Sequence, residues 1–122
     1  MPAHADLQPV FNELRALLKP LSKGMVVVHD TDGHYCLDTT KSAPNGKPMF
    51  FASARIMKDT VSVYLMPVYT APALLADISP ELKKRMQGKS CFNFKTVDAA
   101  LFKEFGALAK KGLAQFRKDG WA

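Results

Sequence analysis

The chain has 122 residues, which is enough for one domain with a single core and too few for two domains of ordinary size. Hydrophobic residues make up 48% and charged residues 23% of it, and this balance excludes an intrinsically disordered chain. The apolar runs 25–28 and 71–76 are too short to cross a membrane, and the first ten residues lack the regions of a signal peptide. We therefore predict a single cytoplasmic domain over residues 1–122.

The net charge of +6 is concentrated near the C-terminus. Residues 83–122 contain ten Lys and Arg but only three Asp and Glu. Such a surface either neutralises the phosphates of a nucleic acid or forms ordinary solvated helix faces. The chain carries no nucleic-acid-binding motif and no interleaved stacking aromatics, so the solvated surface is favoured over a nucleic-acid partner. The basic side chains concerned are Lys83, Lys84, Arg85, Lys89, Lys110, Lys111, Arg117 and Lys118.

The first half of the chain is predicted to form one helix and two β-hairpins. Apolar residues at helical spacing follow Asp6, a good N-cap residue, and continue to Leu18. Asp32-Gly33 is a strong two-residue turn signal between two short runs with strand character. The predicted segments are a helix over 7–18, a hairpin of strands 25–30 and 34–39, and a hairpin of strands 49–57 and 60–68 that turns at Lys58-Asp59.

Side chains alternate between the two faces of a strand, so each hairpin should have two unlike faces. In the second hairpin one face is uniformly apolar, with Ala54 opposite Val63, and should meet the core. Its other face mixes aromatic, hydroxyl and guanidinium groups: Phe51, Ser53, Arg55, Ser62, Tyr64 and Met66. In the first hairpin one face is predicted to carry Val26, Val28, Tyr35 and Leu37, and the other His29, His34, Cys36 and Asp38.

The second half should supply three helical segments and a fifth strand. Gly106 and Gly112 in the last helix would let it lie close to the sheet. The order predicts an α+β fold, with a mainly antiparallel five-stranded sheet and helices packed on one face. The predicted segments are an apolar helix over 72–78, a helix capped by Ser79 and ending near Gly88, a strand over 90–95, and a helix that is capped by Asp98 or Thr96 and ends at Gly120.

Residues 46–120 resemble the YdhG-like family, a domain family of unknown function. The resemblance lies in Gly46-Lys47-Pro48, Val61-Ser62-Val63-Tyr64-Leu65, Gly88-Lys89-Ser90, and Phe92 with Phe94. It implies a frataxin-like two-layer sandwich and transfers no active site. Some members are described as iron chaperones, which makes metal delivery an alternative function. The first helix here offers only Asp6 and Glu13 as acids, beside Arg15 and Lys19, and so departs from the acidic ridge that frataxin uses for iron.

Two groups of residues are candidate sites. The mixed face around Arg55 and Tyr64 could hold a small ligand or a protein partner, including a second copy in a homodimer. The four side chains His29, His34, Cys36 and Asp38 are ligand types for Zn²⁺ or Fe²⁺, or else an ordinary polar sheet face.

No catalytic motif is visible in the sequence, and no cofactor is implied. Cys91 beside Lys89 could be an activated thiol or a small, partly buried strand residue. Neither cysteine belongs to a CxxC pair, so both are predicted to be free thiols. The sequence thus predicts a non-enzymatic binding domain, with a metal or iron chaperone as the alternative.

Overall fold

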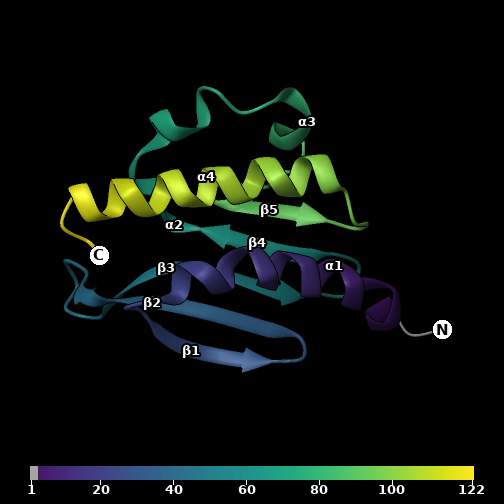
Figure 1. Ribbon diagram of the computed structural model, residues 1–122, viewed down its shortest axis with the longest axis horizontal. Helices are drawn as coiled ribbons and strands as arrows, with labels where there is room; N and C mark the ends of the chain where they lie inside the picture. Colours follow the sequence, from purple (N-terminus) through teal and green to yellow (C-terminus); the bar gives the residue numbers. More distant parts are fainter. Residues whose placement is uncertain (1–2) are drawn as a thin grey trace.

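The computed structural model describes the backbone of residues 3–122 and the side chains from residue 7 onward. It contains one five-stranded antiparallel sheet, in the order β1-β2-β3-β4-β5, with the two long helices α1 and α4 packed on one face (Figure 1). This confirms the predicted α+β fold class. The elements are α1 (Ala3–Leu18), η1 (Lys19–Ser22), β1 (Val26–Thr31), β2 (His34–Ser42), β3 (Pro48–Ile56), β4 (Val61–Leu65), α2 (Met66–Thr70), η2 (Pro72–Leu75), α3 (Pro80–Lys83), β5 (Cys91–Phe94) and α4 (Ala99–Lys118).

Helix α1 starts earlier than the sequence suggested. It begins at Ala3, so Pro9 lies inside the helix rather than in its first turn. The side chain of Asp6, the predicted cap, lies outside the described residues. The apolar stripe is nevertheless the predicted one, since Val10, Phe11 and Leu14 are all buried. The burial of this stripe therefore outweighs the backbone hydrogen bond that a proline removes.

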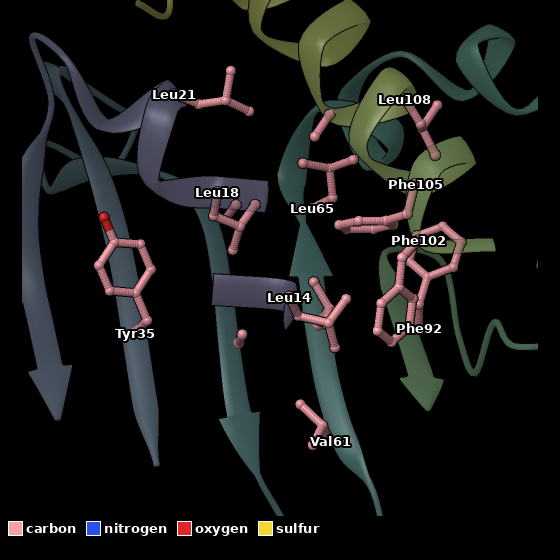
Figure 2. Close-up of a cluster of buried hydrophobic side chains, with 14 of the residues drawn as sticks. Leu14, Leu18, Leu21, Tyr35, Val61, Leu65, Phe92, Phe102, Phe105 and Leu108 are labelled. Carbon is pink, nitrogen blue, oxygen red and sulfur yellow. The ribbon is translucent and has the colours of Figure 1, made fainter. Parts of the chain in front are cut away.

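Helix α4 closes the core over β4 and β5. Asp98 caps it, because its Oδ1 accepts a hydrogen bond of 3.1 Å from the Leu101 amide. Phe105 meets Phe92 edge-on with ring centroids 5.3 Å apart, and Figure 2 shows both rings among the buried side chains of the two helices and the sheet.

No helix in the described part of the chain has the length and apolar character that a bilayer crossing requires.

The glycines of α4 serve contacts between helices rather than contact with the sheet. A Cβ added at Gly112 would lie 2.8 Å from the Cβ of Pro67 in α2. A Cβ added at Gly106 would lie 3.2 Å from the Cδ2 of Leu17 in α1. The prediction that these glycines approach the sheet is therefore wrong, because α1 and α2 lie beside α4 at these positions.

The predicted pairing of the second hairpin is confirmed from Ala52–Leu65 to Ile56–Val61. Ala54 lies opposite Val63, and Arg55 lies opposite Ser62. Ala54 and Val63 are fully buried against the helices, whereas Arg55 is exposed. The side of the sheet away from α1 and α4 is called the open face below.

Strand β1 departs from the prediction because it is an edge strand with a bulge between Val27 and His29. The bulge puts Val26 opposite Asp38 on the open face instead of beside Tyr35 and Leu37 in the core. Every residue of β1 is exposed, Val28 included. Helix α1 contacts β1 through an ion pair of 2.7 Å between Arg15 and Asp30.

Candidate functional site: the open sheet face

The register of the sheet arranges the open face as three rows of side chains that run across the strands. The residues of one row lie opposite one another on neighbouring strands and point to the same side. The first row is Thr31, His34, Arg55, Ser62 and Asn93; the second is His29, Cys36, Ser53, Tyr64 and Cys91; the third is Val26, Asp38 and Phe50.

Arg55 and Tyr64 are the prominent groups of this face. Tyr64 is 40% exposed although it lies in the middle of the sheet. Across the residues whose side chains are described, no carboxylate lies within ion-pair distance of Arg55. An exposed guanidinium beside an exposed phenol is the kind of pair that anchors binding interfaces.

The phenol of Tyr64 stays protonated at neutral pH. Its interaction with the Cys91 side chain raises the pKa of this phenol, and partial burial adds to the effect. The hydroxyl group can therefore donate a hydrogen bond to a partner.

The short side chains between the prominent groups are tied together by hydrogen bonds. The Ser62 hydroxyl donates to Oδ1 of Asn93 at 2.7 Å, and Nδ2 of Asn93 donates to Oε1 of Gln87 at 2.6 Å. The Cys91 thiol donates to the same Oδ1 at 3.6 Å. These bonds satisfy the buried Ser62 hydroxyl and fix the floor of the face.

Two of the predicted ligand-binding residues lie elsewhere. Phe51 is the extra residue of a bulge in β3, which turns its ring into the core against Phe116 at a centroid distance of 5.8 Å. Met66 does not extend β4 but begins α2, and it packs against the core. Ser53, Arg55, Ser62 and Tyr64 lie on the open face as predicted.

Sequence reasoning missed Asn93 as a member of the site and did not place Cys91 beside Tyr64. The signal was present in the fifth strand, because Phe92 and Phe94 both point into the core. Period two then sends Cys91 and Asn93 to the opposite side of the same strand.

The four candidate metal ligands share the open face but do not converge. The rings of His29 and His34 are stacked, with centroids 4.4 Å apart and planes only 18° from parallel. Stacked imidazoles direct their lone pairs along parallel planes rather than toward one point. Within the described residues, no group of three or more His, Cys, Asp or Glu side chains is placed to hold a metal ion.

Partial burial shifts the titration of three of these four groups. Burial lowers the pKa of His34, and the neighbouring His29 and Arg55 lower it further, so this ring is neutral at pH 7. Burial raises the pKa of Asp38, although His29 works in the opposite direction. Burial, with a smaller effect from Asp38, raises the pKa of the Cys36 thiol from 9.0 to about 11.

We expect iodoacetamide to alkylate Cys36 slowly at pH 8. The alkylation rate should rise with pH as a thiol with a pKa of about 11 ionises. Because the folded state holds this proton more tightly than the unfolded chain does, its contribution to stability is present below pH 9 and is lost as the pH rises toward 11. The alkylation rate is measured in a Cys91→Ser background. The stability loss is the difference between the wild type and Cys36→Ser in urea unfolding at several pH values.

The basic residues do not form one continuous site. Lys84, Arg85 and Lys95 line a cavity of about 470 Å³ at the end of the sheet, together with Asp59. The basic residues at the C-terminal end of α4 are exposed and point away from the core: Lys110, Lys111, Arg117 and Lys118. The basic residues at the C-terminal end of α4 thus have the solvated arrangement that the sequence favoured.

Comparison with protein-family models, with curated proteins and with solved structures finds no match for this chain. The resemblance to the YdhG-like family therefore stays a prediction, and the function has to be argued from the geometry.

Proposed function

We propose that this protein is a non-catalytic, cytoplasmic binding domain that docks a protein partner on its open sheet face, and that a second copy of the chain is this partner. The observation that carries the proposal is the uncovered pair of Arg55, which has no carboxylate partner among the described side chains, and Tyr64, 40% exposed in mid-sheet. A protein partner is favoured over a small molecule because the cavities of about 620, 470 and 350 Å³ do not include Arg55 or Tyr64.

The face is complementary to itself in charge. Arg55 lies in the first row and Asp38 in the third, on either side of the middle row that contains Cys36, Ser53 and Tyr64. In a face-to-face dimer with its two-fold axis along the middle row, Arg55 of one copy faces Phe50 in the third row of the other copy, one strand away from Asp38, which its long side chain can reach. The same axis passes through the middle row and so places Tyr64 against the partner's Tyr64.

Two properties of the described groups support docking over catalysis. The Cys36 thiol, with its pKa raised to about 11, is a neutral and weakly nucleophilic group at pH 7. The Cys91 side chain is buried and donates to Asn93 rather than standing free in a cleft.

Small side chains in the middle row, Ser53 among them, let two such faces approach closely.

Charge reversal tests the proposal by sedimentation equilibrium. We expect the wild type to dimerise reversibly, and Arg55→Asp or Asp38→Arg alone to weaken dimerisation by at least about 30-fold, because each reversal opposes like charges. The double variant Arg55→Asp with Asp38→Arg should recover most of the affinity, since it rebuilds both pairs with their signs exchanged.

The matched control for Arg55→Asp is Lys103→Asp, which makes the same change in net charge on the exposed side of α4 and should leave dimerisation unchanged. Circular dichroism confirms that each variant is folded. A wild type that remains monomeric up to millimolar concentration would overturn the proposal, as would a double variant no better than the single ones.

A further inference from the structure

A second concave surface lies apart from the open face, at the segment that connects β4 to β5. A cavity of about 620 Å³ separates the helical turns after β4 from the turn that precedes β5. Its size falls in the range of sites for small organic ligands. It is lined by Val68, Tyr69, Pro72, Leu75, Met86, Gly88 and Lys89.

The two walls of this cavity are held at a fixed separation. One wall is α2 with η2, and α2 is anchored by the buried Val68. The other wall is the turn around Gly88, whose φ of +87° favours glycine. The amide of Leu65 donates to the Ser90 carbonyl at 2.9 Å, which joins the two walls at their base. A Cβ added at Gly88 would meet no atom within 4 Å, so this glycine borders open space.

The lining combines an apolar floor with one cation. Lys89 is the only charged residue among those that line the cavity, and its Nζ lies 6.0 Å from the centre of the Tyr69 ring. Over the residues with described side chains, no carboxylate pairs with this ammonium group. Tyr69 is 53% exposed, so one aromatic wall faces solvent although it belongs to a concave surface.

We propose that this cavity binds a small aromatic carboxylate. The ring of the ligand lies on the apolar floor between Leu75 and Met86, with its face or edge against Tyr69. Its carboxylate accepts a charge-assisted hydrogen bond from the ammonium group of Lys89. The net positive charge of residues 83–122 also favours a negatively charged ligand.

The test compares two probes of the same shape, 2-naphthoate and the neutral 2-naphthalenemethanol, by NMR titration of the full chain. We expect 2-naphthoate to bind saturably and to shift the amide signals of Tyr69, Gly88 and Lys89. Lys89→Met should weaken 2-naphthoate about tenfold and leave the alcohol unchanged, because it removes the charge and keeps the length of the side chain. Lys103→Met is the matched control and should change neither affinity.

A second variant, Leu75→Ala, shortens the apolar floor and should weaken both probes alike. The proposal is overturned if the wild type binds 2-naphthoate without saturation, if the shifts centre on Arg55 and Tyr64 instead, or if Lys89→Met binds 2-naphthoate as tightly as the wild type. Dimerisation on the open face is a separate measurement, so either proposal can fail without the other.

Discussion

Phe105→Ala should lower the free energy of unfolding by about 3–5 kcal/mol, the range found when a buried phenylalanine is truncated in a core that cannot collapse. The ring of Phe105 is fully buried and meets Phe92 at 5.3 Å and Phe94 at 6.3 Å. Its removal leaves a cavity between α4 and β5, and it also removes two edge-on aromatic contacts. Urea unfolding followed by circular dichroism measures the loss.

The control for this variant is a truncation on the same helix that removes no buried atoms. Lys103 is exposed two positions away, so Lys103→Ala should change the unfolding free energy by less than about 0.5 kcal/mol. If Phe105→Ala cost no more than Lys103→Ala, α4 would not pack on the sheet as described.

The two glycines of α4 should respond oppositely to the same substitution. Gly112→Ala should destabilise the protein by about 1–3 kcal/mol, because the new methyl group would lie 2.8 Å from the rigid ring of Pro67. Gly106→Ala should be neutral or stabilising by up to about 1 kcal/mol, because the gain in helix propensity is opposed only by the movable end of Leu17. Thermal and urea unfolding of the two variants measure the difference.

These variants are matched in helix, residue type and added volume, so helix propensity alone predicts equal stabilisation of both. An equal response at Gly106 and Gly112 would contradict the close approach of α2 to α4. The shared control is the wild type at the same concentration, since the proposed dimerisation would also change the apparent stability.

The turn of the first hairpin and the buried side of the second hairpin could be predicted because each depends on local information. Asp32-Gly33 marks the first turn, and the alternation around Ala54 and Val63 fixes which side of the second hairpin is buried. Ser79 was likewise predicted to be a cap, and the structure confirms this because its Oγ accepts a hydrogen bond from the Leu82 amide. In each case a few adjacent residues carry the whole signal.

The bulges could not be predicted, because a bulge changes which residue is unpaired without changing the apolar pattern. Phe50 and Phe51 are chemically identical, yet the bulge in β3 sends only Phe51 into the core. The bulge in β1 moved Val26 to the open face in the same way. The proposed ligand set consequently lost Phe51, whereas Arg55 lies beyond the bulge and kept its predicted face.

The connection between β4 and β5 was the least predictable part of the chain. The sequence suggested a helix from Ser79 to near Gly88, but α3 has only four residues. The chain then turns beside β5, where Met86 forms an isolated bridge with Phe92. Tertiary pairing with the sheet thus replaces helical hydrogen bonds, and the cavity that results has no signature in local sequence.

The most direct test of the proposed docking surface is the contact between two copies of the chain. Equal amounts of ¹³C-labelled and unlabelled protein are mixed, and an isotope-filtered nuclear Overhauser experiment detects protons of one chain that lie close to the other. We predict contacts between chains from the ring protons of Tyr64 and from the side chain of Arg55. Contacts confined to α4 or to the cavity at Lys89, or no contacts at a concentration where the protein is dimeric, would contradict docking on the open face.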